Sequence, residues 1–119
     1  MMSARWFAAM ALAAALLGNV PVSSSRAQSI TAGQFRAPKS EKDMTANRAY
    51  LIGAKDALLA YNNAAEDKLF CLPGVPQLSF DQASDIVMRW TRKRSINADG
   101  LPLALVLLYG LRENYPCPH

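Results

Sequence analysis

The first 27 residues have the pattern of a secretory signal peptide, and this pattern limits what the rest of the chain can form. Arg5 precedes an uncharged apolar run over residues 6–17, and Ser25 and Ala27 supply small residues at the −3 and −1 positions of a cleavage site. The run is shorter than the roughly 20 residues of a membrane-spanning helix, so we expect no stable membrane anchor. Cleavage after Ala27 leaves residues 28–119, which are enough for one small domain.

The signal peptide also carries part of the positive charge. The whole chain of 119 residues has a formal net charge of +4, and removal of Arg5 and Arg26 lowers this charge to +2. A protein that binds nucleic acid normally presents a strongly basic face. We therefore expect no nucleic-acid partner.

The exported part contains two cysteines, Cys71 and Cys117, which can form one intramolecular pair. Such pairs usually oxidise outside the cytoplasm, so we expect a disulfide between them. Closing this loop would stabilise the fold by about 4 kcal/mol in the chain-entropy model, which helps a domain too small for a large core. A redox or metal-binding role is the alternative. It has less support, because the chain has no CxxC motif and its only histidine is His119.

Residues 28–39 are mostly polar and are expected to form a flexible N-terminal arm in front of a helical domain over residues 40–119. The first helix is expected over about residues 40–65, with Ser40 as N-cap and Asp43 three residues later. Its apolar residues recur at helical spacing and predict a buried stripe. A second strip of small residues predicts close approach of another backbone. The stripe contains Met44, Leu51, Ala54, Leu58 and Tyr61, and the strip contains Gly53, Ala57 and Ala60.

Proline and glycine make residues 69–78 a connecting loop. The second helix is expected to begin with a capping box formed by Ser79 and Gln82, and to end in a basic cluster. That cluster suits the negative pole of the helix dipole. The face predicted to be buried comprises Phe80, Ala83, Ile86, Val87 and Trp90.

The third helix is expected to start near Asn97 or Asp99, with Pro102 in its first turn, and to end near Asn114. Apolar residues cover nearly every side of it, which predicts a central position. A buried strand over residues 103–108 is the alternative, but leucine and alanine favour a helix. The predicted fold is therefore all-α: a small single-domain bundle of three main helices with one disulfide.

No arrangement of residues indicates catalysis or a cofactor site. A single histidine near the end of the chain provides no Ser/His/Asp or Cys/His set. The carboxylate pairs Asp81/Asp85 and Glu66/Asp67 suit helix capping and solvated helix ends better than acid–base chemistry. The sequence contains neither a P-loop nor a Gly-x-Gly-x-x-Gly motif. We therefore expect a protein that is not an enzyme and that binds no metal or cofactor.

Four short motifs occur in order along the chain. They are Tyr50–Asp56 (YLIGAKD), Phe70–Pro73 (FCLP), the helix that contains Gln82, and Tyr115–Cys117 (YPC). Together they resemble the Rap/Tai family, periplasmic immunity proteins against amidase effectors of type VI secretion, over about residues 44–117. The resemblance implies a small helical domain, a disulfide between the two cysteines, and inhibition of a cell-wall amidase by covering its active site. Some members dimerise, which leaves a homodimer open.

A partner surface is expected around residues 70–78 and the basic end of the second helix. An inhibitor has to be rigid, because ordering a flexible loop on binding lowers affinity, and two prolines with the expected disulfide make this loop well preorganised. The expected contact residues are Gln77, Arg89, Arg92, Lys93 and Arg94. A structural loop beside a solvated helix end is one alternative, and contacts on the exposed face of the first helix are another.

The alternative function is that of a periplasmic stress or chaperone protein without an amidase partner. Chaperones that act at low pH usually rely on many titrating groups, and this chain has nine carboxylates and one histidine. We therefore favour binding of one specific protein partner, by one copy of the chain or by a homodimer.

Overall fold

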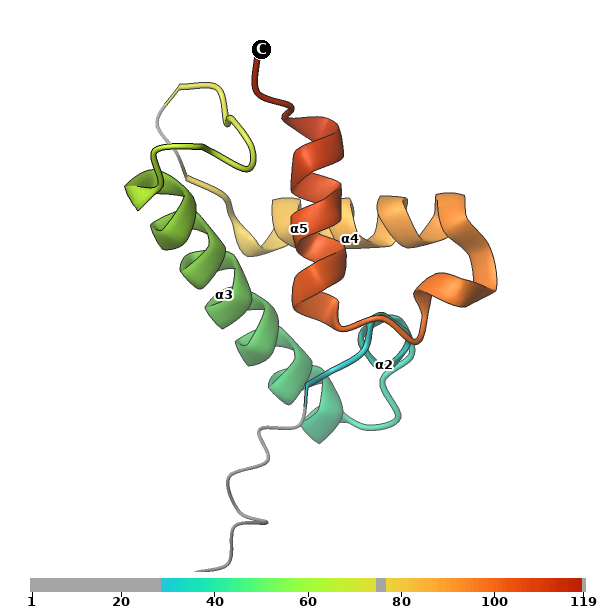
Figure 1. Ribbon diagram of the computed structural model, residues 1–119. Coiled ribbons are helices and arrows are strands. Elements are labelled where there is room, and N and C mark those ends of the chain that lie inside the picture. Colours follow the sequence, from blue (N-terminus) through green and yellow to red (C-terminus); the bar gives the residue numbers. More distant parts are fainter. Residues whose placement is uncertain (1–28, 75–76, 119) are drawn as a thin grey trace, which may run out of the picture.

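The computed structural model describes residues 29–74 and 77–118. The helices are α2 (Ala32–Arg36), α3 (Glu41–Ala64), α4 (Phe80–Arg94) and α5 (Leu103–Asn114), and the 3-10 helix η2 (Ser95–Ala98) follows α4 (Figure 1). The predicted signal peptide lies outside the described residues. None of the described helices is long and apolar enough to cross a bilayer. The predicted all-α fold with three main helices is confirmed.

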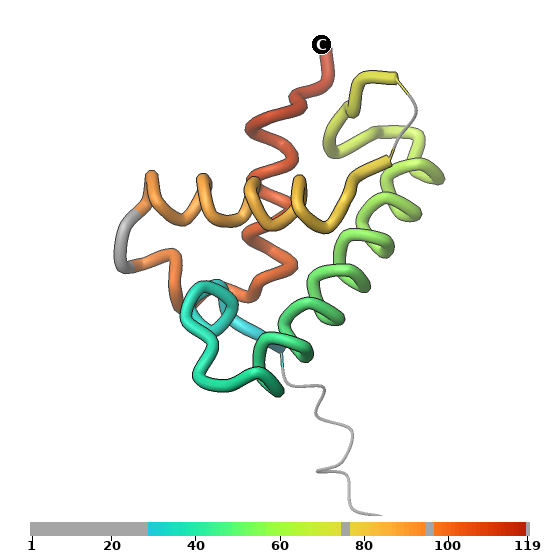
Figure 2. Tube along the Cα trace, turned by 180° about the vertical axis from the view of Figure 1, so that it is seen from behind, coloured from blue at the N-terminus to red at the C-terminus, as the bar shows by residue number. Residues whose placement is uncertain are grey.

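Helix α5 lies at the centre of the fold. It crosses α4, and α3 packs beside both of them (Figures 1 and 2). A Cβ atom on Gly110 would collide with Cγ2 of Ile86, so the absence of a side chain lets the two helices approach at this point. The predicted central helix is confirmed, and the alternative strand over residues 103–108 is wrong. The core residues with less than 2% exposure include Leu51, Phe70, Ile86, Val87, Leu103, Val106, Leu107 and Leu111.

The N-terminal end of α3 is capped as expected, with the Oγ of Ser40 accepting a hydrogen bond from the amide of Asp43 at 3.1 Å. The predicted apolar stripe is only partly correct. Leu51 is fully buried, but the side chains at the two ends of the stripe, Met44 and Tyr61, are 57% and 62% exposed. Helix α3 has 24 residues and is about 36 Å long, which is longer than the core beneath it.

The small-residue strip of α3 faces solvent, and the predicted close approach of another backbone is wrong. Gly53, Ala57 and Ala60 are all exposed. A Cβ atom added to Gly53 would meet no atom within 4 Å. The strip lies on the side of the helix opposite Leu51, and α4 and α5 pack only on the Leu51 side.

The second predicted helix is confirmed in its start and its buried face. The amide of Ser79 donates to Oε1 of Gln82 at 2.9 Å, and the amide of Gln82 donates to Oγ of Ser79 at 3.1 Å. Both halves of the predicted capping box are therefore formed. Ala83, Ile86 and Val87 are buried, and Phe80 and Trp90 are half-buried.

Helix α5 begins at Leu103, later than predicted. Residues 95–98 form η2, and Pro102 lies just before the helix instead of in its first turn. The cause is pairing with the N-terminal segment: the amide of Leu103 donates to the carbonyl of Ile30 at 2.8 Å, and the amide of Ala32 donates to the carbonyl of Leu101 at 2.9 Å. These bonds hold the chain extended until residue 103.

The N-terminal segment is part of the folded domain, which differs from the flexible arm expected over residues 28–39. Thr31 and Gln34 form a complete capping box for α2. Ala32 is fully buried, and the amide of Gly33 donates to the carbonyl of Asp99 at 3.0 Å. Arg36 adds an ion pair to the carboxylate of Asp99 at 3.1 Å.

Candidate partner-binding surface

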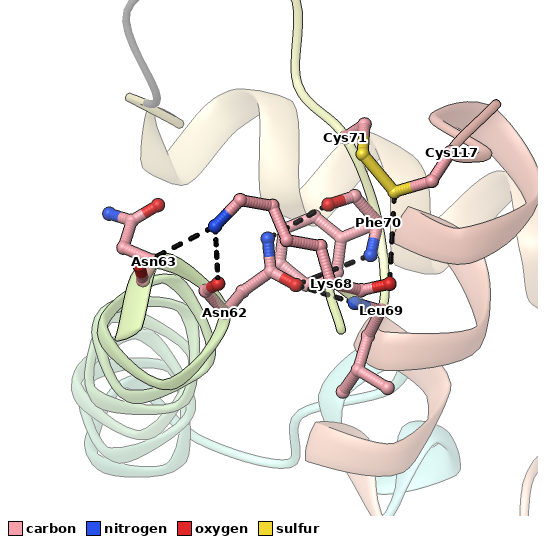
Figure 3. The surroundings of a disulfide bond; sticks show 7 residues. All are labelled: Asn62, Asn63, Lys68, Leu69, Phe70, Cys71 and Cys117. Atoms are coloured by element: carbon pink, nitrogen blue, oxygen red, sulfur yellow. Dashed lines mark hydrogen bonds between the residues drawn. A yellow bond between two sulfur atoms is a disulfide. The ribbon is translucent and has the colours of Figure 1, made fainter. Parts of the chain in front are cut away.

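The loop after α3 is tied to the C-terminal segment by a covalent bond. Cys71 and Cys117 form a disulfide, with their Cα atoms 4.9 Å apart, which confirms the predicted pairing (Figure 3). Beside the disulfide, the amide of Cys71 donates to the carbonyl of Tyr115 at 2.8 Å. The start of the loop is therefore held against the end of α5 by two different kinds of bond.

Asn62, in the last turn of α3, holds the same loop from the other side. Its Oδ1 accepts hydrogen bonds from the amides of Leu69 at 2.8 Å and Phe70 at 3.3 Å, and its Nδ2 donates to the carbonyl of Phe70 at 2.8 Å (Figure 3). The Nζ of Lys68 donates to the carbonyl of Asn62 at 3.0 Å, where a cation suits the C-terminal end of the helix. Phe70 can therefore bury its ring completely.

Gln77 is exposed at the edge of a polar groove between α3 and the start of α4. The groove has a volume of about 390 Å³. Its wall comes from the middle of α3 on one side and from the capping box of α4 on the other. The lining residues are Lys55, Asp56, Leu59, Gln77, Leu78, Ser79 and Gln82.

Acidic partners neutralise much of the predicted basic cluster. Arg89 forms an ion pair with Asp85 at 2.9 Å. Arg94 and Lys93 both reach Glu113 on α5, at 2.7 Å and 3.5 Å. The structure therefore brings Lys93 and Arg94 together around one carboxylate of the neighbouring helix.

Arg92 lies apart from that pair of cations. It comes two residues before Arg94 and therefore lies on a different side of α4. Its Nε donates to the carbonyl of Met88 at 3.3 Å. The five expected contact residues thus do not form one contiguous cluster.

The two cations beside Glu113 change its acidity. Partial desolvation by itself would raise the pKa of the Glu113 carboxyl, but the hydrogen bond from Arg94 and the charges of Arg94 and Lys93 outweigh it and lower the pKa below its usual value. Glu113 is therefore ionised at neutral pH. It holds both cations in place between α4 and α5.

Gln77 and the basic cluster lie at opposite ends of α4. The helix has 15 residues and is therefore about 22 Å long. A standard protein interface covers about 800 Å² on each partner. A partner of ordinary size is therefore wide enough to span the length of α4.

An aromatic hollow between α4 and α5 was not found by sequence reasoning. The rings of Trp90 and Tyr109 have their centroids 5.6 Å apart, and Cζ of Arg94 lies 4.3 Å from the centroid of the Trp90 ring. Arg112 and Glu113 complete the lining of a space of about 380 Å³. Spacings of four residues connect Trp90 with Arg94 and Tyr109 with Glu113, but only the packing of α4 on α5 brings the two pairs together.

The chemistry of this surface is that of binding. It offers guanidinium groups and aromatic rings, which are enriched in protein interfaces. Among the described residues, no three His, Cys, Asp or Glu side chains come close enough together to hold a metal ion.

Comparison with known proteins identifies a family. The family model of Rap1a immunity proteins matches residues 26–117. Searches of curated proteins and of solved structures found no match. The matched region includes all four motifs on which the resemblance to the Rap/Tai family rests.

Proposed function

The chain belongs to the family of Rap1a immunity proteins, and we propose that it protects its cell in the periplasm by binding a peptidoglycan amidase effector of type VI secretion. The family match confirms the resemblance inferred from the motifs. Family membership is the observation that carries this proposal. An immunity protein acts by binding a secreted toxic effector, so we propose that the chain has no catalytic activity of its own.

The proposed mechanism is occlusion of the amidase active site by a rigid surface. Residues 69–71 are held by Asn62, by the disulfide and by the backbone bond to Tyr115. Because this segment is already ordered, binding costs little conformational entropy. We propose that the interface extends from Gln77 to the basic end of α4, where Arg89, Arg92, Lys93 and Arg94 lie.

The test uses a candidate peptidoglycan amidase effector, sought first among the genes that neighbour this one. The oxidised domain, residues 28–119, is titrated into that amidase while release of peptide from purified peptidoglycan is followed. We expect loss of hydrolysis at a fixed molar ratio and a Kd in the nanomolar range. Light scattering of the complex also shows whether one or two copies of the chain take part.

A cellular control tests the compartment. The full chain should protect cells in which the amidase is exported to the periplasm, and a chain that starts at residue 28 and stays in the cytoplasm should not. Undiminished hydrolysis in the presence of excess domain would contradict the proposal. Suppression of aggregation of several unrelated unfolded proteins would instead support the chaperone alternative.

A further inference from the structure

We propose that the binding energy for the effector is concentrated in the hollow between α4 and α5, and that the hollow receives an acidic side chain that the partner presents beside an apolar one. We call its lining residues Trp90, Arg94, Tyr109, Arg112 and Glu113 the aromatic–arginine patch. The inference rests on the proposed function, because it names the part of the surface that recognises the effector and the chemistry of what is recognised.

The residue types of the patch are the first reason. Trp, Tyr and Arg are the residues most enriched at the energetic centres of protein interfaces, where they fill or line pockets. Tyr109 is one of three large apolar side chains that are exposed among the described residues, at 38%. Its ring stands 5.6 Å from that of Trp90, so the two rings together form one wall of the hollow.

The second reason is that the side chain of Arg94 in the patch is already held in place. The guanidinium of Arg94 is held by the Glu113 carboxylate at 2.7 Å and lies over the ring of Trp90. Its side chain nevertheless remains 40% exposed. A guanidinium has five N–H donors, and these contacts leave some of them for a partner. A partner carboxylate would therefore meet an arginine that has already lost its rotamer freedom, which reduces the entropic cost of binding.

The net positive charge around the patch indicates which kind of partner group it binds. Lys93 and Arg94 contact the carboxylate of Glu113, and Arg112 lines the same hollow, so these four side chains have an excess of two positive charges. Among the described residues, Arg112 forms no ion pair. An excess of positive charge attracts an acidic surface and raises the association rate with it. The aromatic wall then favours an apolar neighbour of that acidic group.

The experiment compares two variants of the patch with two matched variants on α3. Tyr109→Ala and Arg112→Glu change the patch. Tyr61→Ala and Lys42→Glu make the same kinds of change at exposed positions of α3. Association and dissociation rates with the amidase are measured by surface plasmon resonance, and melting temperatures are measured by circular dichroism.

We expect Tyr109→Ala to weaken binding about 30-fold, mainly through faster dissociation, as for a central interface residue. Arg112→Glu should lower the association rate about tenfold at low salt, with a smaller effect at high salt because charges are screened. Both α3 variants should bind within twofold of the parent. An acid-to-lysine change on the amidase that restores association with Arg112→Glu would identify the acidic contact.

Several outcomes would overturn the inference. If both patch variants fold and bind as the parent does while the parent still neutralises the amidase, the patch is not the contact and the proposed function stands. Weaker binding by Tyr61→Ala alone would move the contact to α3. Patch-dependent retention on purified peptidoglycan, whose peptides also carry carboxylates, would replace the protein partner by the cell wall. A parent domain that binds no amidase would overturn both proposals.

Discussion

Asn62 connects the end of the longest helix to the loop that follows it. Its side chain is only 4% exposed, and it makes hydrogen bonds to both backbone groups of Phe70 and to the amide of Leu69. A buried backbone group without a hydrogen-bond partner is costly. The side chain of Asn62 supplies partners for three such groups, as a neighbouring strand would do in a sheet. In the sequence it resembles its exposed neighbour Asn63, and only the path of the loop distinguishes the two.

Asn62→Ala should therefore lower the free energy of unfolding by about 3 kcal/mol, because two amides and one carbonyl lose their partner. Asn63→Ala is the matched control, since Asn63 is exposed and Lys68 donates to its backbone carbonyl, not to its side chain. We expect a change within about 0.5 kcal/mol for the control. Urea denaturation of the oxidised proteins measures both. Equal stability of the two variants would show that the side chain of Asn62 does not hold the loop.

Glu113 gives the α4–α5 contact a pH dependence. Its carboxyl has a pKa below the usual value because Arg94 and Lys93 favour the charged form. A carboxyl whose pKa is lower in the folded state stabilises the fold above its unfolded pKa, and this stabilisation is lost as the pH falls through the folded pKa. We expect Glu113→Gln to be less stable than the parent at pH 7, and we expect the difference to shrink as the pH falls through the folded pKa of Glu113. Thermal melts across this range check the sign, and the difference at pH 7 should shrink in 1 M salt.

At the scale of the elements, two glycines inside helices have opposite surroundings. Gly110 lies in α5 where it crosses α4, and a side chain there would collide with Ile86. Gly53 lies in α3 on a face that α4 and α5 do not cover, and a side chain there would meet nothing within 4 Å. The close packing that the sequence suggested for Gly53 occurs at Gly110, because the crossing point depends on how the helices are arranged and not on helical spacing.

The same substitution at the two glycines should have effects of opposite sign. Gly53→Ala should stabilise the fold by about 0.5–1 kcal/mol, because alanine is the better helix former and the site is open. Gly110→Ala should destabilise it by about 1–3 kcal/mol, since the extra methyl group overfills the contact with Ile86. Chemical denaturation of the pair gives the comparison. A stabilised Gly110→Ala variant would show that α4 and α5 can separate at little cost.

The N-terminal segment gives a second prediction at this scale. A chain that starts at residue 40 loses the buried Ala32 and the backbone bonds to Asp99, Leu101 and Leu103. We expect its melting temperature to be at least about 10 °C lower than that of a chain starting at residue 28. Arg36→Ala, which removes only an exposed ion pair, should cost less than about 1 kcal/mol. A truncated chain with an unchanged melting temperature would support the flexible arm.

In the whole molecule, contacts with distant parts of the chain hold both ends of the central helix α5. Residues 30–33 pair with the segment that leads into α5, and the disulfide ties the segment after α5 to the loop that follows α3. Segments from the start, the middle and the end of the chain therefore contact one another around α5. This arrangement gives a small domain a fixed shape although its core is limited, which suits a protein that works by presenting one surface.

Removal of the disulfide tests how much of that shape depends on it. The double variant Cys71→Ala/Cys117→Ala should lose about 4 kcal/mol of unfolding free energy, because the open chain has more conformational entropy. At low denaturant the amides of Leu69 and Phe70 should stay protected from hydrogen exchange, since Asn62 still holds them. Fully reduced parent protein is the control and should match the variant. A variant as stable as the oxidised parent would contradict the entropic contribution.

The sequence by itself determined the features that neighbouring residues encode. The helical caps at Ser40 and Ser79, the non-helical chain at Pro73, the buried face of α4 and the pairing of two cysteines each depend on short spacings or on a simple count, and each agrees with the structure. The family also followed from short motifs in order.

Only the tertiary structure decided which surfaces are covered and which charges are paired. The start of α5 depends on Ile30, the open face of α3 depends on where α4 and α5 pack, and the partners of Arg94 lie on another helix. These contacts join residues that are 19 to 73 positions apart, so no pattern within one helix encodes them. They form because packing the apolar faces brings the helices together, and that packing is a property of the whole chain.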